Sequence, residues 1–272
     1  MTSKSHVHYS HRGLRHHKIS NLYRFNVHVL LPFFLVLISV FVSAKFFAFK
    51  GIIGVGDASL LLKAVGASFL RLFIAYIISL VFGVALALLA ISSRKVESIL
   101  LPVFDILESV PILVFFPVII LFCVSYGFLN AAAVLIISLN MIWNIVFACI
   151  GGLRLIPEDI AAVGRVFRLS LWQRFWKITL PALFPYILTG SLLAWAEGWN
   201  MLIVAEVLKT YVSKSLAPSD LFGIGSVLVQ ASVDADTKMF FGAVIMIILT
   251  VVVINVFVWQ PLLRTSEKYK FD

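Results

Sequence analysis

The chain has 272 residues, of which 61% are hydrophobic and only 13% are charged, and its formal net charge is +9. A soluble domain has about 45–50% apolar and about 25% charged residues, so this composition excludes a soluble globular enzyme, a disordered chain and a disulfide-stapled secreted domain. The length suits a membrane protein with several helices of about 20 residues. The two cysteines, Cys123 and Cys149, lie in apolar runs and form neither a disulfide framework nor a metal-ligand pattern.

Continuous apolar runs recur six times along the chain. They lie near residues 28–49, 67–91, 99–123, 129–150, 180–207 and 239–262. Each run is long enough to cross about 30 Å of hydrocarbon as a helix. The runs do not alternate apolar and polar residues, which favours helices over a β-barrel. We therefore predict one all-α membrane domain at 28–263, a polytopic helical bundle of about six spans.

The basic residues between the runs predict the orientation of the bundle. Both tails, the pair at 94–95 and the segment 151–179 carry 15 of the 22 Lys and Arg residues, whereas the opposite side carries six. Cytoplasmic loops are enriched in Lys and Arg, so these segments are predicted to be cytoplasmic and loop 208–238 extracytoplasmic. The same clustering explains the positive charge by topology rather than by nucleic-acid binding. The predicted location is the cytoplasmic (inner) membrane.

Two polar tails flank the predicted membrane domain. Residues 1–27 form a basic tail, and residues 264–272 form a short C-terminal tail. All six histidines lie within the first 28 residues, so the first tail either binds a metal or is a solvated basic segment near anionic lipid. A cleavable signal peptide is not expected, because a polar stretch of 27 residues precedes an apolar run of more than 20.

The most informative segment is the stretch 156–185, whose first part is too polar to span a membrane. Its apolar residues recur at helical steps of three or four, at Ile160, Val163, Phe167, Leu171, Phe175 and Ile178. This period predicts helical structure with one apolar face. Pro157 suits a first helical turn, and Glu158 and Asp159 follow where the helix dipole favours anions. A turn is expected near 168–169.

A second short helix is expected to follow this turn. Ser170 and Gln173 match the S-x-x-Q capping box at its start, and Pro181 is expected to open the next span. The resulting helical hairpin has two interpretations. It lies flat on the membrane interface, with Trp172 and Trp176 at headgroup level, or it docks as a lever into a groove of a partner protein.

The hairpin resembles the cytoplasmic "EAA" loop of permease subunits of ATP-binding-cassette importers, in particular the nitrate/sulfonate/taurine type. The similarity runs from Pro157 to "ITLPALFPYILTG" at 178–190, and it includes "AEV" at 205–207 and "GIG" at 223–225. Upstream, "ASFLRLFIAYIISLVFGVALALLAIS" at 67–92 and "SVPILVFFPVIILF" at 109–122 are similar to the second and third spans of that family. The similarity is collinear over roughly residues 65–263.

The resemblance implies the architecture of type I (MetI-like) importer permeases. It implies a second permease copy, identical or paralogous, an extracytoplasmic substrate-binding protein and a cytosolic ATPase dimer that carries ATP and Mg. It also implies a small anionic substrate of the nitrate, sulfonate, taurine or bicarbonate class. The ATPase-coupling residues carried over are Pro157, Glu158, Asp159, Ile160, Val163, Gly164, Phe167, Arg168, Ser170, Leu171, Gln173 and Phe175. This chain has no G-x-x-x-x-G-K-[ST] phosphate loop, so no cofactor is expected on it.

The hairpin departs from the family pattern at its turn. Arg168 stands where the family has a loop glycine, and Ala162, Val163 and Gly164 stand where it has Glu-Ala-Ala. A left-handed Arg168 would cost about 1 kcal/mol. Either the turn is rebuilt or Gly164 takes part of its role. The stretch 206–223 is also longer than usual for the family.

Ionisable and amide residues inside the spans are candidates for a translocation pathway, because they are costly in hydrocarbon. With the prolines of the third run, the candidates are Arg71, Pro111, Pro117, Asn140, Asn144, Glu197, Asn200 and Glu206. Nine residues place Glu197 and Glu206 on opposite helix faces. The family similarity favours Glu206 as a partner of Arg71, in a structural pair or a gate.

Two further features of the spans leave alternatives open. Asn140 and Asn144 share a helix face, for interhelical hydrogen bonds or for a polar pathway. Pro102, Pro111 and Pro117 are expected to break or kink the third run, which makes 109–120 a pathway candidate. Asp105 and Glu108 are expected near the cytoplasmic end of that run.

Three classes of function fit a polytopic membrane protein. The first is a permease subunit of an ATP-driven importer. The second is a self-contained secondary transporter or channel, which needs no docking hairpin and often shows inverted repeats that are not evident here. The third is an intramembrane enzyme, which needs a catalytic set such as H-E-x-x-H, whereas no histidine lies beyond position 28. The hairpin favours the first class.

Overall fold

The computed structural model describes residues 55–126, 128–157, 160, 164, 166–207 and 221–266, and these contain helices and turns but no strand. The all-α prediction is confirmed for this part of the chain. Four helices in it are long and apolar enough to cross a membrane, at Asp57–Ala90, Leu129–Arg154, Leu171–Glu206 and Thr237–Ser266. They coincide with four of the six predicted runs. The predicted tail at 1–27 and the run at 28–49 lie outside the described residues.

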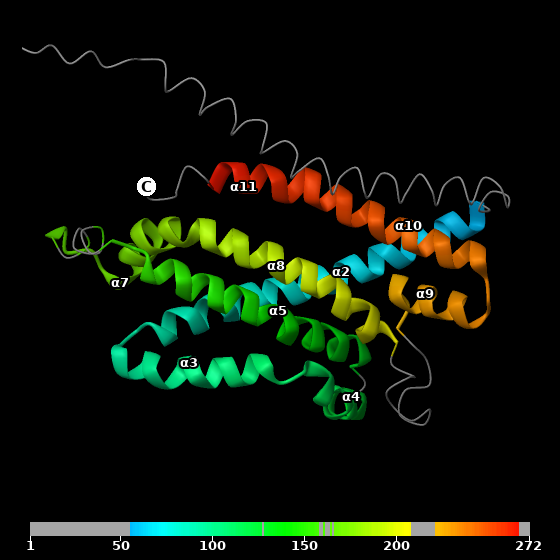
Figure 1. Ribbon diagram of the computed structural model, residues 1–272, viewed down its shortest axis with the longest axis horizontal. Helices are drawn as coiled ribbons and strands as arrows, with labels where there is room; N and C mark the ends of the chain where they lie inside the picture. Colours follow the sequence, from blue (N-terminus) through cyan, green and yellow to red (C-terminus); the bar gives the residue numbers. More distant parts are fainter. Residues whose placement is uncertain are drawn as a thin grey trace, which may run out of the picture. The chain divides into compact units, whose positions relative to one another are not determined.

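The long helices pack beside one another along much of their length (Figure 1). Helix α2 (Val55–Ala90) and helix α5 (Leu129–Arg154) are single continuous helices, and α8 (Leu180–Glu206) packs mainly on α5. Helix α10 (Thr237–Ile254) contacts α2 and the short helix α9 (Ile224–Val233). The predicted loop 208–238 therefore contains a helix, because 224–233 is apolar enough to pack on α2.

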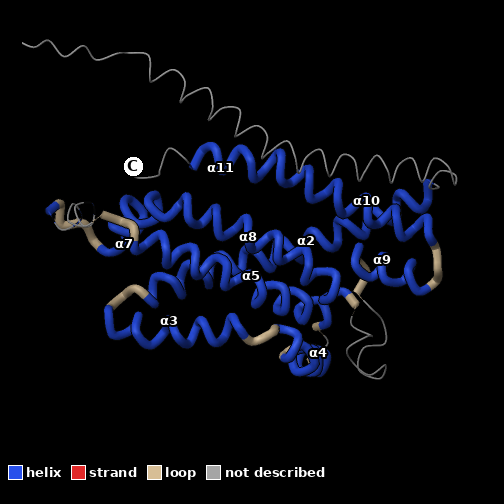
Figure 2. Tube along the Cα trace, viewed as in Figure 1, coloured by secondary structure: helices blue, strands red, loops and turns tan. Residues whose placement is uncertain are grey.

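The third predicted run is not one span. It forms α3 (Arg94–Ser109), the 3₁₀ turn η1 (Ile112–Val114) and α4 (Phe116–Ser125), with the interruption at Pro111 (Figure 2). Val110 before it is extended, as expected for a residue preceding proline. Pro117 lies in the first turn of α4, where proline is tolerated, and α3 continues through Pro102. Only one of the three prolines therefore ends a helix.

Two helices continue past prolines because a π-helical turn precedes each proline. Helix α7 (Leu171–Arg174) continues through η2 (Phe175–Thr179) into α8, so Pro181 does not open a new helix as predicted. The N–H of Leu180 bonds the carbonyl of Phe175, five residues back. Likewise α10 continues through η4 (Asn255–Trp259) into α11 (Gln260–Ser266), just before Pro261. The wider π turn accommodates the proline ring, which in a regular α-helix would clash with the carbonyl four residues before it.

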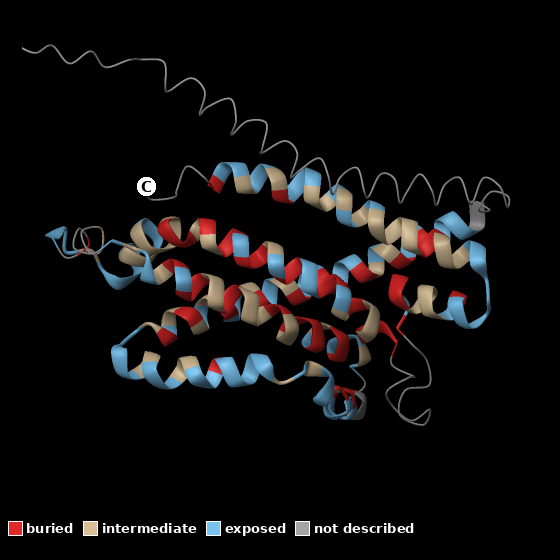
Figure 3. Cartoon of the chain, viewed as in Figure 1, coloured by how far each residue is buried: buried red, intermediate tan, exposed pale blue. Residues whose placement is uncertain are grey.

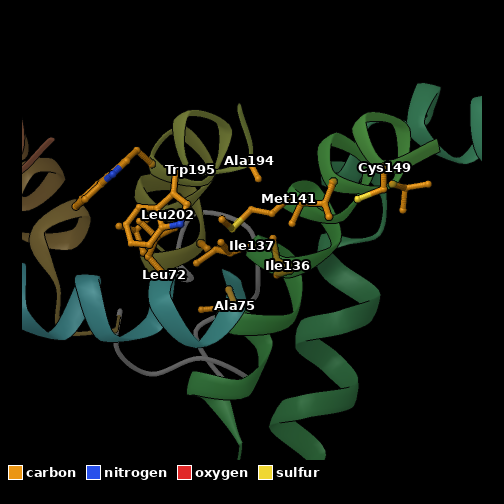
Figure 4. Packing of buried hydrophobic residues seen from close by; sticks show 14 of the residues in the cluster. Leu72, Ala75, Ile136, Ile137, Met141, Cys149, Ala194, Trp195 and Leu202 are labelled. Carbon is orange, nitrogen blue, oxygen red and sulfur yellow. The ribbon is translucent and has the colours of Figure 1, made fainter. Parts of the chain in front are cut away.

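The core lies between α2, α5 and α8. Leu72, Ile136, Met141 and Leu202 are fully buried there, and Figure 4 shows side chains from the three helices meeting. Buried residues form stripes along the inward faces of α5 and α8, whereas α3 is mostly exposed (Figure 3). Gly190 allows α8 to approach α5 closely, because a Cβ there would lie 2.8 Å from the carbonyl oxygen of Asn144.

The bundle has two ends, named here after residues at each. The Glu206 end contains the beginnings of α2, α5 and α10, together with α9. The Arg154 end contains the ends of α2 and α5, the beginning of α3 and the hairpin before α8. At the Arg154 end, the guanidinium of Arg154 donates to Glu97 over 2.6 Å and links α5 to α3.

Candidate functional site

The hairpin at the Arg154 end turns on a left-handed Arg168. Its φ is +47°, and the N–H of the following Leu169 donates to the carbonyl of Gly164 over 3.0 Å. This six-to-one hydrogen bond with a left-handed residue beside it is a Schellman motif, which normally has glycine at that position. The turn of the resembled family is thus kept despite the arginine, and the alternative of a rebuilt turn is wrong. Strain of about 1 kcal/mol is the consequence.

The hairpin has two arms, one before and one after the turn at Arg168, and local contacts hold them. Ser170 caps α7, since its hydroxyl accepts from the N–H of Gln173 while the Gln173 side chain accepts from the N–H of Ser170. The predicted capping box is confirmed. Gly164 is buried, and a Cβ there would lie 3.2 Å from Ile178. Gly164 therefore serves the close approach of the first arm to the second, not the left-handed turn.

The tip of the hairpin is apolar and exposed. We define the hairpin tip as Val166, Phe167, Leu171 and Trp172, whose side chains are between 69% and 86% exposed. Trp172 stacks edge-on against Trp176 with ring centroids 5.4 Å apart. Large apolar side chains gathered at such exposure mark an interaction surface.

The other predicted coupling residues surround the hairpin tip. Pro157 is exposed between α5 and the first arm, Ile160 is half-buried in that arm, and Phe175 begins the π turn η2. Glu158, Asp159 and Val163 lie outside the described residues. The assignment of these residues to coupling stays a prediction.

A buried ion pair joins the helices at the Glu206 end. Nη1 of Arg71 lies 2.5 Å from Oε1 of Glu206, and both side chains are buried. Arg71 also donates from Nε to Oδ1 of Asn130 over 2.9 Å and from Nη2 to the carbonyl of Phe222 over 2.7 Å. The pairing that the sequence suggested is confirmed, and the guanidinium bonds α2 to α5, α8 and the segment before α9.

The Glu206 carboxylate accepts from three separate donors. Besides Arg71, the hydroxyl of Ser68 donates over 2.5 Å and the N–H of Gly225 over 2.8 Å. Gly225 lies in the first turn of α9, where the helix dipole favours a negative charge. At Gly223 a Cβ would collide with this carboxylate. We call this set the Arg71–Glu206 network.

The Arg71–Glu206 network links α2, α5, α8 and the segment before α9 through buried polar bonds. Removing one partner of a satisfied buried ion pair costs about 3–5 kcal/mol, because the other charge is then buried alone. Beside the network, the N–H of Leu221 bonds the carbonyl of Glu206 over 3.1 Å. Sequence reasoning did not predict that Asn130 and the backbone groups of 222–225 belong to the network. The "GIG" glycines at 223–225 are the sequence feature that could have indicated a close approach of the backbone to the Glu206 side chain.

A second group of polar residues lies on the paired helices α5 and α8. A Cβ at Gly198 would lie 3.0 Å from the sulfur of Met141, and Gly190 lies against Asn144 and Ala148. The two helices are antiparallel, so this register brings Glu197 of α8 to the level of Asn140 of α5. That level is the middle of α5.

These polar residues face away from α2. Asn140 lies two residues, about 200°, around α5 from Ser138, whose carbonyl accepts a hydrogen bond from Ser79 of α2. Glu197 lies two residues around α8 from Trp195, whose ring contacts Tyr76 of α2. Both polar side chains therefore belong to the same side of the α5–α8 pair.

We define the polar patch as the four residues on this side: Asn140, Asn144, Glu197 and Asn200. Glu197 and Asn200 are exposed, and the two α5 residues are partly exposed. No side-chain hydrogen bond joins any of them to another residue in the described part of the chain. The alternative of interhelical bonding by Asn140 and Asn144 is thus not what the described helices show. Glu197 and Glu206 do face opposite ways, as predicted.

The remaining pathway candidates belong to the third run. Pro111 and Pro117 are exposed, while Phe116 and Ile120 between and after them anchor α4 in the core. Asp105 and Glu108 were expected near the cytoplasmic end of this run. Asp105 instead lies away from the Arg154 end. The preceding Phe104 contacts Trp143, in the middle of α5, with ring centroids 5.7 Å apart. The reason is that α3 begins earlier than predicted, at Arg94.

The apolar spans, the intramembrane polar residues and the hairpin define a multi-pass helical membrane protein. The family described as the binding-protein-dependent transport system inner membrane component matches residues 79–259. The match covers well over half of the chain, so the chain belongs to this family. The sequence-based assignment to this family of importer subunits is confirmed.

Named relatives narrow the similarity. The nitrate import permease protein of Leptolyngbya laminosa is 31% identical over 173 residues, which cover 64% of this chain and 61% of the relative. The bicarbonate transport system permease protein of Synechococcus elongatus is 30% identical over 142 residues, or 52% of this chain and 50% of the relative. The chain thus spans about half to three fifths of the length of these relatives.

Proposed function

We propose that this chain is the membrane-spanning subunit of an ATP-driven importer and couples to a cytosolic ATPase through its hairpin. The observation that carries the proposal is the hairpin tip. Four large apolar side chains are exposed at one end of the bundle, on two short arms joined by a Schellman turn. A soluble partner with an apolar groove would cover them, by the mode in which a helix docks into a groove.

The continuity of α7, η2 and α8 supports a mechanical role. Residues Leu171–Glu206 form one helical rod that begins at the hairpin tip and ends in the Arg71–Glu206 network. A displacement of the hairpin would therefore move the whole span that carries Glu197. The chain does no covalent chemistry in this proposal. The partner ATPase dimer holds ATP and Mg and performs the hydrolysis.

The polar patch is the proposed translocation pathway. Amide and carboxylate groups at the middle of a spanning helix are costly against lipid, so they face water or protein. A second permease copy packed beside this side of α5 and α8 would enclose them between the two subunits. An extracytoplasmic substrate-binding protein would then deliver substrate at the Glu206 end. The lipid bilayer surrounds the rest, and no nucleic acid takes part.

The charges support a cytoplasmic Arg154 end. Seven basic residues in the described part of the chain lie at this end: Arg94, Lys95, Arg154, Arg168, Arg174, Lys177 and Arg264. At the Glu206 end, the described exposed ones are Lys63 and Lys238. This asymmetry follows the positive-inside rule. A cytoplasmic Arg154 end would put the hairpin tip within reach of a cytosolic ATPase.

The substitution Phe167→Asp tests the docking proposal. It puts a charge in the middle of the hairpin tip without touching the core, because Phe167 is 71% exposed. We expect co-purification with the candidate ATPase to fall at least tenfold, which corresponds to about 1.4 kcal/mol of binding free energy. The matched control is Ser92→Asp, which adds the same charge at an exposed turn of the same end.

Two results together decide the matter. Loss of the ATPase with Phe167→Asp, but not with Ser92→Asp, supports the proposal. If the ATPase stays bound to the Phe167→Asp chain and ATP-dependent uptake is unchanged, the hairpin tip is not the coupling surface.

A further inference from the structure

We propose that the substrate of this permease carries a cationic nitrogen group and has no net negative charge. The proposal rests on the proposed function and deepens it, because it assigns a charge preference to the pathway. It stands on the polar patch and on the charges that surround it.

The polar patch offers acceptors without a counter-ion. Glu197 contributes a carboxylate that only accepts hydrogen bonds, and the three asparagines contribute amide oxygens and amide N–H groups. None of the four has a side-chain hydrogen bond to another described residue, so their donors and acceptors are unpaired within that part of the chain. An amine, ammonium or guanidinium group matches a carboxylate flanked by amide oxygens.

The basic residues of the described spans do not neutralise Glu197. Arg71 is the described guanidinium that does not lie at the Arg154 end, and its three nitrogens are bonded to Glu206, Asn130 and the Phe222 carbonyl. Lys63 and Lys238 lie near the Glu206 end, and the other basic residues of the described part lie at the Arg154 end. Among the described residues, no basic side chain therefore pairs with Glu197, which lies at the middle of the bundle.

Acidic residues on α3 add further negative charge. Asp105 and Glu108 are exposed on α3, and Phe104 places this part of α3 at the level of Trp143 in α5. A second copy of the chain across the pathway would contribute the same residues again. Two Glu197 carboxylates would then face one passage.

An anion would cross this passage against repulsion. One unit charge at 4 Å changes the local concentration of a monovalent ion about fivefold in water, and more in a less polar surrounding. Rings of carboxylates select cations in channels for the same reason. Nitrate and bicarbonate appear in the names of the relatives, and both are anions. The polar patch therefore points to a different substrate in this chain.

The charge preference can be measured without knowing the substrate. The variant Asn200→Cys places a thiol one helical turn from Glu197 on the same face. The full chain, in lipid nanodiscs open on both sides, is treated with a cationic trimethylammonium methanethiosulfonate or an anionic sulfonate methanethiosulfonate. The ratio of the two rates is normalised to the ratio for free 2-mercaptoethanol. The unsubstituted chain is the background, because Cys123 and Cys149 are buried.

We expect the normalised ratio to favour the cationic reagent about tenfold, because the carboxylate attracts one reagent and repels the other. Glu197→Gln in the same background is expected to bring the ratio close to one, whereas Glu197→Asp is expected to keep it. A purely structural role for Glu197 would not separate the two variants in this way.

Two outcomes overturn the inference. A normalised ratio near one or below one for Asn200→Cys shows that the passage does not prefer cations. No reaction with either reagent shows that the polar patch is not lined by water. Neither outcome bears on ATPase association, which the Phe167→Asp experiment measures separately. Failure of the inference and failure of the proposed function are therefore distinguishable.

Discussion

Arg168 shows how one residue can be kept in an unfavourable conformation by its neighbours. The bond from Leu169 to Gly164 and the capping box of Ser170 hold the turn from both sides. An L-residue with a side chain is strained at a φ of +47°, whereas glycine is not. The arginine is therefore tolerated by local hydrogen bonding and not preferred by its own conformation.

The substitution Arg168→Gly is expected to stabilise the protein by about 1 kcal/mol, because it removes the left-handed strain. For a chain of this size that corresponds to a rise in Tm of about 2–4 °C, measured by thermal unfolding of the purified chain in detergent. Val166→Gly is the matched control, since Val166 is also exposed but helical, and glycine there is expected to destabilise. A lower Tm for Arg168→Gly would contradict the left-handed turn.

At the scale of elements, the contact of α5 with α8 depends on small residues. Gly190 and Gly198 let the backbones approach, and this sets the register that brings Glu197 to the level of Asn140. Membrane helices pack by such close contact, because lipid supplies little hydrophobic force between them. The position of the polar patch is therefore a consequence of helix packing.

The substitution Gly190→Ala tests this packing. Its Cβ would lie 2.8 Å from both Ala148 Cβ and the Asn144 carbonyl oxygen, so α8 must move away from α5. We expect a loss of about 1–3 kcal/mol in unfolding free energy, measured by denaturation in mixed micelles. Gly151→Ala is the control, because nothing lies within 4 Å of its added Cβ. Equal stability of the two variants would argue against a close α5–α8 contact.

At the scale of the whole molecule, the two ends of the bundle differ in chemistry. The Arg154 end is basic and carries the exposed hairpin tip, whereas the Glu206 end is closed by the Arg71–Glu206 network and covered by α9. One rod, Leu171–Glu206, connects the two ends. This arrangement suits a protein that receives force on one side and substrate on the other.

The orientation can be checked with single cysteines. Ser92→Cys lies at the Arg154 end and Val233→Cys at the Glu206 end, and both positions are exposed. In intact cells a membrane-impermeant maleimide is expected to label Val233→Cys, and to label Ser92→Cys only after permeabilisation. The physical reason is the excess of basic residues at the Arg154 end. The reverse labelling pattern would invert the proposed topology.

Sequence alone determined the features that depend on local pattern. Apolar run length predicted four spans that the structure contains, and the Ser170–Gln173 spacing predicted a cap whose two hydrogen bonds link residues three apart. The pairing of Arg71 with Glu206 was suggested by similarity. The third run misled because an apolar run does not reveal where proline ends a helix, and here Pro111 does so while Pro102 does not.

Only the tertiary structure decided which distant groups meet. Asn130 and the backbone of 222–225 complete the Arg71–Glu206 network, and the α5–α8 register assembles the polar patch from residues more than 50 positions apart. Such contacts depend on crossing geometry and close packing between helices, and no local spacing encodes these. Hydrogen bonds within a turn can be inferred from a few neighbouring residues, whereas bonds between helices require the positions of both backbones.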